Sequence, residues 1–467
     1  MIPQRLAWLR EPDGVPGQLA RIFTEAGHRL YLVGGSTRDA LLNRPHFDLD
    51  FTTDARPDEI KKVVNNWADG VFTVGEAFGT IGVVKDGHTH EITTFRSEVY
   101  RDDSRKPQVV FSDDLEVDLS RRDFTINAIA LQFPDPEVID PYGGLADLSN
   151  GILRTPLAPE VSFSDDPLRM LRLFRFVATL GFEPDTATLA AVVDMADRLS
   201  IVSSERIRDE LSKLLTADQP GTALTGLVRT GLADHIVPEL AELEMAQDPI
   251  HRHKDVLAHT IAVVEKTEPK LELRLAALLH DIGKPATRQF SDSGATFHHH
   301  EVVGARMARQ RLRELRYPKQ VVNDVGQLVF LHLRPHTFKM GWTDSAVRRY
   351  VRDAGHLLDD LNQLVRCDVT TRNPARATEI QNRIDDLEDR IAALREKEHL
   401  ESLRPPIDGN DVMSYLGLPP GPEIGEIMDL LTEQRIEQGP YEPEEAYRLV
   451  RQWALERGRG DPGEKVG

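Results

Sequence analysis

The sequence predicts an α+β protein in which a small mixed sheet near the N-terminus is followed by an all-α remainder. Short apolar runs interrupted by glycines, as in residues 71–84, continue to about residue 144. From about residue 155, apolar residues recur every three or four positions, which is the period of helices. The chain has 467 residues, enough for several domains. We therefore expect a sheet-containing head followed by a longer helical part.

The order of these patterns predicts the elements and the domain boundaries. Residues 15–30 have the apolar spacing of a helix, while Tyr31 to Val33 and Phe47 to Thr52 resemble short strands. Beyond Pro374, Ile380 to Leu394 form an amphipathic stripe typical of a helix. The expected domains are a head at 15–150, a helical neck at 151–220, a histidine-rich body at 221–373 and a helical tail at 374–457.

Composition places limits on the compartment and the partners. The formal net charge is −19, which by itself gives no indication of nucleic acid, although a local basic face can still bind RNA. Cys367 is the only cysteine, which is typical of a reducing compartment. We find no signal peptide and no transmembrane run, so we expect a cytoplasmic protein with no membrane partner.

Two carboxylates in the head have the spacing of a metal site. Asp48 and Asp50 flank Leu49, so on a strand both would point to one side. Such a pair can hold two divalent cations, here Mg²⁺, as phosphoryl transfer requires. Glu91 on a later strand is a candidate third carboxylate. The alternative is that both aspartates simply face solvent, which is the common case for so short a motif.

A glycine turn precedes these carboxylates by about a dozen residues. Gly34 and Gly35 follow a predicted strand and precede Arg38-Asp39, where we expect a helix to begin. Glycines at such a turn allow backbone amides to approach phosphate oxygens. The turn is not a Walker A loop, and alone it would more often be an ordinary connection. Together, the turn and the carboxylate pair favour a nucleotide site.

These motifs resemble the head of class II tRNA CCA-adding enzymes, members of the polymerase-β-like superfamily that also contains bacterial poly(A) polymerases. The resemblance rests on ordered blocks between about residues 20 and 455: 34–39, 48–53, Arg-Arg-Asp-Phe-Thr-Ile-Asn-Ala at 121–128, Asp-Pro-Tyr-Gly-Gly at 140–144, and Asp-Asp-Pro-Leu-Arg at 165–169. It implies a polymerase-β-like head. The residues it assigns to nucleotide binding are Gly34, Gly35, Arg38, Arg121, Arg122, Asp123, Asn127, Asp166, Arg169, Arg172 and Arg175.

The chemistry of these side chains agrees with that assignment. Arg121 and Arg122 can form bidentate hydrogen bonds to a triphosphate, and Asp123 can accept from a ribose hydroxyl. Asp166 and Arg169, three apart on a predicted helix, would face one side and match the Watson–Crick edges of C and A. A surface charge cluster and a plain helix ion pair are the alternatives. The resemblance also implies a specificity loop between Phe95 and Phe111, where we expect a mobile segment.

Histidines and carboxylates farther along form a second candidate metal site. His259, His280-Asp281 and Asp368 resemble the ligands of HD-domain phosphohydrolases, with His300 and His332 as candidates for a second metal position. Imidazole and carboxylate ligands suit several divalent metals, so the metal stays open. The alternative is that these histidines are satisfied core or loop residues.

The resulting functional prediction is addition of C, C and A to the 3′ end of tRNA from CTP and ATP, together with an HD phosphohydrolase. Addition of CC alone, addition of A alone, a poly(A) polymerase, and an HD phosphohydrolase whose head only binds RNA remain alternatives. Cyclic 2′,3′-phosphates or 3′-phosphates are the HD substrates that the resemblance implies. The oligomeric state stays open.

Overall fold

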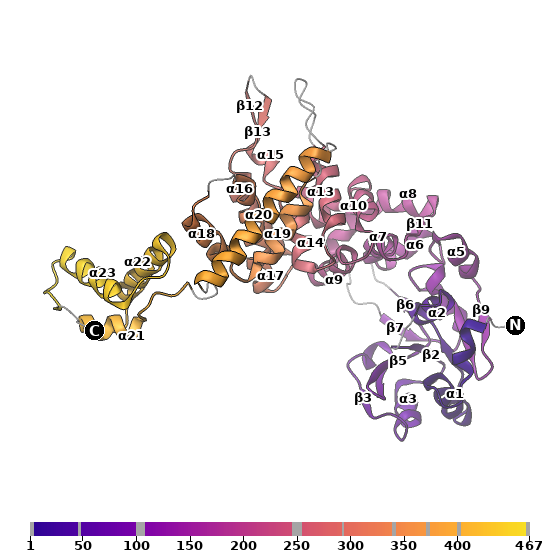
Figure 1. Cartoon of the computed structure of the whole chain (residues 1–467). Helices are drawn as coiled ribbons and strands as arrows, with labels where there is room; N and C mark the ends of the chain where they lie inside the picture. Colours follow the sequence, from indigo (N-terminus) through magenta and orange to yellow (C-terminus); the bar gives the residue numbers. More distant parts are fainter. Residues whose placement is uncertain are drawn as a thin grey trace. The chain divides into compact units, whose positions relative to one another are not determined.

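A computed structural model describes residues 4–44, 48–99, 108–244, 255–291, 294–338, 342–369, 374–398 and 403–463. The elements are labelled in Figure 1. Contacts divide the chain into two units. The first comprises Met1–Ala241 with Glu314–Tyr317, and the second comprises Glu242–Arg313 with Pro318–Gly467. Within the described residues, no helix has both the length and the apolar character needed to span a bilayer.

The first unit contains a mixed sheet with the strand order β3-β4-β5-β2-β1-β8-β9. Its strands are β1 Leu30–Leu32, β2 Asp50–Thr53, β3 Gly70–Phe72, β4 Thr80–Lys85, β5 His88–Thr94, β8 Ala130–Phe133 and β9 Glu137–Ile139. β2 and β5 are parallel, whereas the other neighbours are antiparallel. The small mixed sheet of the head is thus confirmed.

The central strands present one apolar and one polar face. Phe51 lies opposite Ile92, which lies opposite Ile81, and all three side chains are buried. Because side chains alternate along strands, Asp50 and its partner Glu91 occupy the other face. The helices of this region are α1 Val15–Glu25, α2 Gly34–Leu41, α3 Pro57–Val64, α4 Leu115–Ser120 and α5 Gly144–Asn150. α3 contacts both β4 and β5.

Three expected boundaries in the head are wrong by a few residues. The helix expected to reach residue 30 ends at Glu25, because Gly27 adopts a positive φ of 82° soon after it. The helix expected to begin near Arg38 already begins at Gly34. The strand expected from Phe47, which lies outside the described residues, begins at Asp50. The amide of Asp50 donates to Oγ of Ser36 at 2.9 Å.

The segment expected to be a mobile loop is regular at both ends. β6 Arg96–Val99 pairs antiparallel with β7 Gln108–Phe111, while residues 100–107 lie outside the described residues. A Cβ on Gly79 would lie 2.8 Å from the Phe111 ring, so this glycine leaves space for the ring. The Arg56 guanidinium lies 5.4 Å from the centre of the same ring. Packing of Phe111 therefore holds the base of this strand pair.

After the head, the first unit continues as helices. These are α6 Pro159–Asp165, α7 Leu168–Leu180, α8 Thr186–Met195, α9 Ser204–Leu215, α10 Pro220–Arg229, α11 Ala233–Ile236 and α12 Pro238–Ala241. α7 packs against α9 and α10. The expectation of an all-α neck is wrong at one point, where β10 Ile152–Leu153 pairs in parallel with β11 Glu183–Pro184. Two residues per strand are too few to produce a period in the sequence.

The second unit is also mainly helical. Its elements are α13 Val256–Lys266, α14 Leu271–Leu279, α15 Lys284–Thr287, α16 His300–Glu314, α17 Lys319–Leu331, α18 Asp344–Ala354, α19 Leu358–Cys367, α20 Pro374–Glu398, α21 Gly409–Leu416, α22 Pro422–Gln438 and α23 Pro443–Glu456. Here too the all-α expectation misses one short pair, β12 Gln289–Ser291 with β13 Gly294–Thr296. α14 contacts α13, α17 and α19 and forms the centre of this body.

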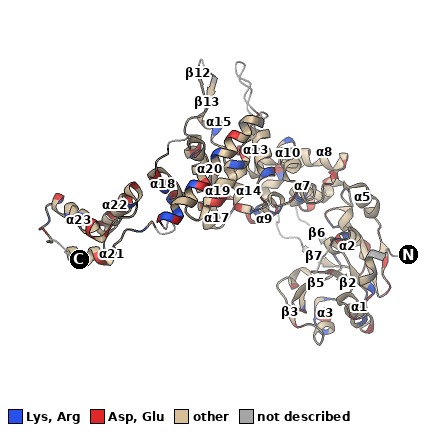
Figure 2. Cartoon of the chain, viewed as in Figure 1, with Lys and Arg blue, Asp and Glu red and all other residues tan. Residues whose placement is uncertain are grey.

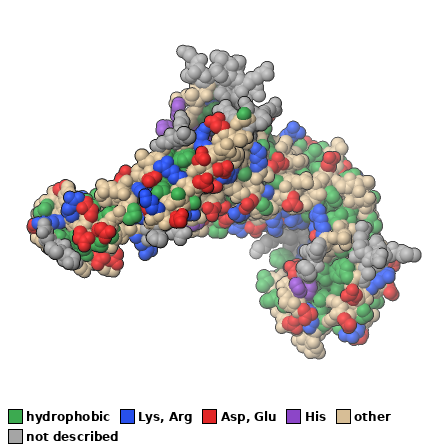
Figure 3. Space-filling view, in the orientation of Figure 1, with side chains coloured by type: hydrophobic (Ala, Val, Ile, Leu, Met, Phe, Trp, Pro, Cys, Tyr) green, Lys and Arg blue, Asp and Glu red, His purple; other side chains and the backbone are tan. Residues whose placement is uncertain are grey.

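The predicted amphipathic helix is α20. Ile384, Leu387, Ile391 and Leu394 of its stripe are buried, and α20 contacts α18 and α19. The stripe therefore packs within the chain. In the view shown, acidic and basic residues alternate along the ribbon of the second unit (Figure 2), and their side chains are interspersed on its surface (Figure 3). The visible face of the second unit therefore carries no patch of a single charge sign.

Candidate functional sites

The head carboxylates lie at the start of the central parallel pair. Asp50 is the first residue of β2 and lies opposite Glu91 of β5. Asp48 precedes the strand, and its Oδ1 lies 3.4 Å from the amide of Thr89. Parallel neighbours that face each other point to the same side of a sheet, so Asp50 and Glu91 share one face. Asp50 and the third candidate, Glu91, therefore share one face, whereas the predicted placement of Asp48 and Asp50 on one strand is wrong, because β2 begins only at Asp50.

The glycine turn lies directly beside Asp50. Gly34 has a φ of 69°, a conformation that favours glycine, and it is the first residue of α2. A Cβ at Gly34 would lie 3.0 Å from Nη1 of Arg122 and 3.9 Å from Oδ2 of Asp50. The missing side chain therefore leaves room where a guanidinium, a carboxylate and a helix N-terminus meet. That arrangement suits a phosphate group.

Both arginines of the adjacent pair are held by Asp118, a residue that the sequence analysis missed. Nη2 of Arg121 lies 2.8 Å from Oδ1 of Asp118, and Nη2 of Arg122 lies 3.2 Å from Oδ2. Burial alone would raise the pKa of Asp118, but the two guanidinium charges outweigh burial and hold the pKa below its usual value. The only sequence signal was its spacing of three and four residues before the arginines, which is common on any helix.

Both carboxylate oxygens of Asp123 accept hydrogen bonds from other residues of the chain. Its Oδ1 accepts from the amide of Phe124 at 2.9 Å and from Nδ2 of Asn127 at 2.8 Å, and its Oδ2 accepts from Nε of Arg172 at 2.9 Å. Burial would raise its pKa, but the Arg172 charge outweighs burial and holds the pKa far below its ordinary range. Asn127 in turn accepts from Arg38 at 2.9 Å. Four predicted residues thus form one network that joins α2 to α7.

The ring of Phe176 brings three of the predicted arginines together. The guanidinium carbons of Arg38, Arg172 and Arg175 lie 5.2, 5.8 and 4.3 Å from its centre. Glu210 of α9 also binds Arg175, with Nε 2.8 Å from its Oε2. Burial, followed by the charge of Arg172, lowers the pKa of Arg175. Neither Phe176 nor Glu210 was predicted, because aromatic rings and single glutamates are common on helices.

The predicted placement of Asp166 on a helix with Arg169 is wrong. Asp166 follows α6 in an extended conformation, with φ −142° and ψ 99°, and α7 begins only at Leu168. Its Oδ1 accepts from the Leu168 amide at 3.2 Å and its Oδ2 from Nη2 of Arg206 at 2.7 Å. Pro167 explains the break, because a proline disfavours helical geometry in the residue before it. Asp166 therefore acts as a cap of α7.

Arg169 is buried and holds backbone and hydroxyl groups. Its Nη1 lies 2.8 Å from Oγ of Ser162, and its Nη2 donates to the carbonyl of Arg121. Arg169 thereby joins α7 to the arginine pair held by Asp118. Of the two predicted base-reading residues, Asp166 is the more accessible, with 19% of its side chain exposed.

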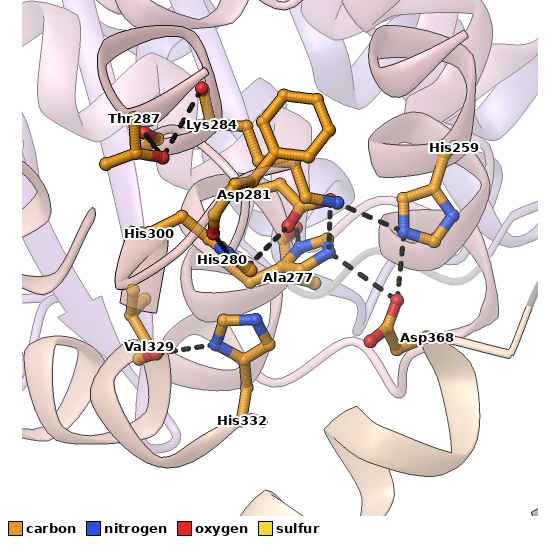
Figure 4. Close-up of polar contacts among 12 residues, drawn as sticks. His259, Ala277, His280, Asp281, Lys284, Thr287, His300, Val329, His332 and Asp368 are labelled. Carbon is orange, nitrogen blue, oxygen red and sulfur yellow. Dashed lines mark hydrogen bonds and ion pairs between the residues drawn. The ribbon is translucent and has the colours of Figure 1, made fainter. Parts of the chain in front are cut away.

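The second unit gathers two groups of metal-ligand type. His259, His280 and Asp368 form one, and Asp281, His300 and His332 form the other. Within each group the ligand atoms all lie within 4.8 Å of one another. No other such group occurs among the described residues, so the head carboxylates are more widely spaced than these. All six predicted residues of this site are brought together (Figure 4).

Helix ends orient these ligands. His280, His332 and Asp368 directly follow α14, α17 and α19, so three helix C-termini, each with a partial negative charge, point to a place that would hold a cation. Nδ1 of His280 lies 2.8 Å from the carbonyl of Ala277, and Nδ1 of His332 lies 2.6 Å from that of Val329. A proton on each Nδ1 leaves Nε2 as the nitrogen that can bind a metal.

The donor set fits a divalent cation. Nε2 atoms of His280 and His300 are buried with no hydrogen-bond partner among the described residues, although His280 Nε2 lies 3.2 Å from Oδ2 of Asp281. Burial would lower the pKa of His280, but the adjacent Asp281 and Asp368 raise it to about 10. Burial and the charge of His280 lower the pKa of His332 to about 3. A bound cation would replace the proton that the carboxylates hold on His280.

Two further side chains that were not assigned to this site contact its carboxylates. Nζ of Lys284 lies 2.5 Å from Oδ2 of Asp281, and Nε2 of His336 lies 3.2 Å from Oδ2 of Asp368. Lys284 follows Asp281 by three residues and was visible as part of the His-Asp motif. His336 lies on a short 3₁₀ turn, residues 335–337, and no spacing pointed to it.

A mixed sheet with carboxylates beside a glycine turn is typical of a nucleotidyltransferase head, and the histidine–aspartate cluster at helix ends has the ligand types of an HD domain. Family models agree. Residues 30–154 match the poly A polymerase head domain, residues 181–244 match a probable RNA and SrmB-binding site of polymerase A, and residues 256–394 match the HD domain.

Relatives extend this match to nearly the whole chain. An A-adding tRNA nucleotidyltransferase of Deinococcus radiodurans is 34% identical over 441 residues, which cover 91% of this chain and 95% of the relative. A CCA-adding enzyme of Geobacillus thermodenitrificans is 30% identical and covers 94% and 96%. The structure of the Bacillus stearothermophilus CCA-adding enzyme in complex with CTP has a TM-score of 0.69 at 25% identity, covering 98% of this chain and all of that one. The chain therefore belongs to the tRNA nucleotidyltransferase family that includes the bacterial CCA-adding enzymes, and it is an enzyme of that class.

Proposed function

We propose that this chain adds C, C and A to the 3′ end of tRNA from CTP and ATP. The observation that carries the proposal is the meeting of Asp50, Arg122 and the N-terminus of α2 at Gly34, in a chain of this family. A carboxylate for the metal, a guanidinium and helix amides for phosphate are the parts that nucleotidyl transfer requires. The enzyme joins the 3′ oxygen of the RNA to the α-phosphorus of the nucleotide and releases pyrophosphate.

Asp48, Asp50 and Glu91 would hold Mg²⁺, because carboxylate oxygens are ligands that this ion prefers. Mg²⁺ at such a site makes the attacking hydroxyl more acidic and neutralises charge on the leaving pyrophosphate. Arg122, which retains unused donors, would bind the triphosphate. Arg121 binds Asp118 and supports the same positive region.

Base selection by Asp166 and Arg169 remains part of the proposal. Asp166 would accept from the exocyclic amine of C or A, which requires it to leave Arg206 or to share it. Arg169 would donate to the ring nitrogen and would exchange part of its bonding to Ser162 or Arg121 for the base. The Asp123 network with Arg172 and Asn127 supports α7 beneath this pair.

Addition of A alone is the second candidate, because the relative from Deinococcus radiodurans carries that name. The test uses three acceptors: tRNA ending at the discriminator base, the same tRNA with one C, and the same tRNA with CC. Each is incubated with CTP, with ATP and with both. CCA addition predicts full-length ends on every acceptor when both nucleotides are present. Extension of the CC acceptor alone would establish A addition, and long A tracts would establish a poly(A) polymerase.

We further propose that the HD site hydrolyses RNA phosphoesters such as 2′,3′-cyclic phosphates or 3′-phosphates. Asp281 supports this assignment because its Oδ2 lies near His280 and its Oδ1 lies 3.5 Å from Nε2 of His300, so one carboxylate faces both ligand groups. Metals in paired sites can polarise phosphoryl oxygens and generate a hydroxide at neutral pH. Release of phosphate from RNA with each type of end, with Mg²⁺, Mn²⁺, Ni²⁺ or Zn²⁺ added in turn, tests this proposal.

A further inference from the structure

The arginine pair of the head, Arg121 and Arg122, contacts a buried carboxylate, Asp118. Asp118 is fully buried on α4. Its Oδ1 accepts from Nε and Nη2 of Arg121 at 3.0 and 2.8 Å, and its Oδ2 accepts from Nη2 of Arg122 at 3.2 Å. One carboxylate thus orients two cations.

The position of Asp118 is itself fixed by the sheet. Thr52 Oγ1 lies 3.4 Å from Oδ2 of Asp118, and the amide of Arg96, the first residue of β6, lies 3.3 Å from Oδ1. Thr52 follows Asp50 by two residues on β2, so both side chains point to the same face. Asp118 therefore lies on the carboxylate-bearing side of the sheet.

Asp118 orients Arg122 but does not use all of its hydrogen-bond donors. Among the described residues, the guanidinium of Arg122 is seen to hydrogen-bond to Asp118, through Nη2. Nε of Arg122 is buried and has no hydrogen-bond partner among the same residues. Its Nη1 points toward the place where Gly34 lacks a side chain, next to Asp50. An arginine that served only the fold would use these donors, since unpaired buried donors destabilise a protein. The free donors indicate a ligand rich in acceptors.

We propose that Asp118 is a positioning residue for nucleotidyl transfer, which holds Arg121 and Arg122 over the Asp50 face so that Arg122 can receive the triphosphate of the incoming nucleotide. The inference rests on the proposed function of the head. Asp118 touches neither nucleotide nor metal and acts through the arginines. Loss of its charge would remove the carboxylate that contacts both guanidiniums. Both CTP and ATP would be affected because they share the triphosphate.

The test compares Asp118→Asn, Arg122→Ala and the double variant in the full-length enzyme, with KM for CTP and for ATP and the inhibition constant of tripolyphosphate as readouts. We expect Asp118→Asn to raise all three by about tenfold, as for loss of one charged hydrogen bond. In the Arg122→Ala background, Asp118→Asn should add less than twofold. Asp147→Asn is the matched control: Asp147 is buried in the same unit and binds Thr125 and Arg154. It should lower thermal stability and leave these constants unchanged.

The outcomes separate the two claims. If Arg122→Ala leaves the KM values and tripolyphosphate inhibition unchanged, the triphosphate assignment is wrong. If Arg122→Ala raises them while Asp118→Asn does not, or if the two effects multiply fully, Asp118 is only structural and the inference is overturned. Should Asp118→Asn fail to fold, Asp118→Asn with Arg121→Gln is compared with Arg121→Gln alone. The double variant lacks one charge of each sign. Relative to Arg121→Gln alone, it should show the same rise in KM.

Discussion

Asp123 and Arg172 form an ion pair, with Nε of Arg172 2.9 Å from Oδ2 of Asp123, that connects the Arg-Arg-Asp segment to helix α7. Both residues belong to motifs some fifty positions apart in sequence. Through Asn127 the same pair reaches Arg38 on α2. The turn that would bind phosphate and the helix that would read the base are therefore parts of one hydrogen-bonded network.

Asp123 should make the stability of the first unit dependent on acid pH. Because its pKa is lowered on folding, its contribution is present above the unfolded pKa of about 4 and is lost as the pH falls below that value. We expect the free energy of unfolding in urea to fall more steeply between pH 6 and pH 3 in the parent than in Asp123→Asn, by an amount on the order of 1 kcal/mol. Asp113→Asn, at an exposed carboxylate, should follow the parent. Equal slopes for all three proteins would contradict the prediction.

Asp50→Asn should abolish nucleotide addition while the fold stays intact. The substitution removes a negative charge from the face shared with Glu91, and loss of a catalytic metal ligand costs several kcal/mol, or about a thousandfold in rate. Single-turnover incorporation of CTP measures the effect. Asp54→Asn is the control, since Asp54 follows the same strand but binds Arg29 at 2.8 Å. Substantial incorporation by folded Asp50→Asn protein would refute the metal assignment.

Asp166→Ala should reduce discrimination between CTP and UTP. Uracil presents a carbonyl where cytosine presents an amine, so the carboxylate repels it, and each unpaired polar group costs about 1–3 kcal/mol. We expect the preference for CTP to fall by about tenfold or more, with slower CTP and ATP addition. Incorporation of each single nucleotide on one tRNA acceptor measures this, with Asp194→Ala on α8 as an exposed control. Unchanged selectivity would make Asp166 only a cap of α7.

His280→Ala should remove bound metal and hydrolysis from the second unit and spare nucleotide addition. Its Nε2 belongs to the group with His259 and Asp368, whereas His300 belongs to the other group. We therefore expect His300→Ala to retain part of the metal content that the parent shows by elemental analysis after dialysis against a chelator and reloading. His356→Ala, at an exposed histidine that binds Asp324, should match the parent. A parent that binds no divalent metal after reloading would show that the cluster is structural.

Short-range sequence patterns predicted several features of the fold and of the candidate sites. Short apolar runs broken by glycines predicted the sheet, and Glu91 was a candidate third carboxylate that the structure places opposite Asp50. Alternation around Leu49 predicted that Asp48 and Asp50 share one strand face, but β2 begins only at Asp50. The apolar stripe of residues 380–394 predicted the helix α20, since the buried positions of this helix follow the helical period. The His-Asp pair predicted the HD cluster because few other functions need that combination.

By itself, the sequence determined the order of the main elements and the candidate residues of two kinds of site, because each depends on residues close together or on ordered motifs. Only the tertiary structure decided which partners these side chains meet. Asp118 beneath Arg121 and Arg122, Phe176 among three arginines and His336 beside Asp368 all depend on how separate elements pack. Asp166 lies before α7 because Pro167 disfavours helical geometry in the residue that precedes it. The spacing of three residues between Asp166 and Arg169 had predicted that both lie on one helix. Packing distances between elements have no period along the chain, and they determine which charges are paired and which donors remain for a ligand.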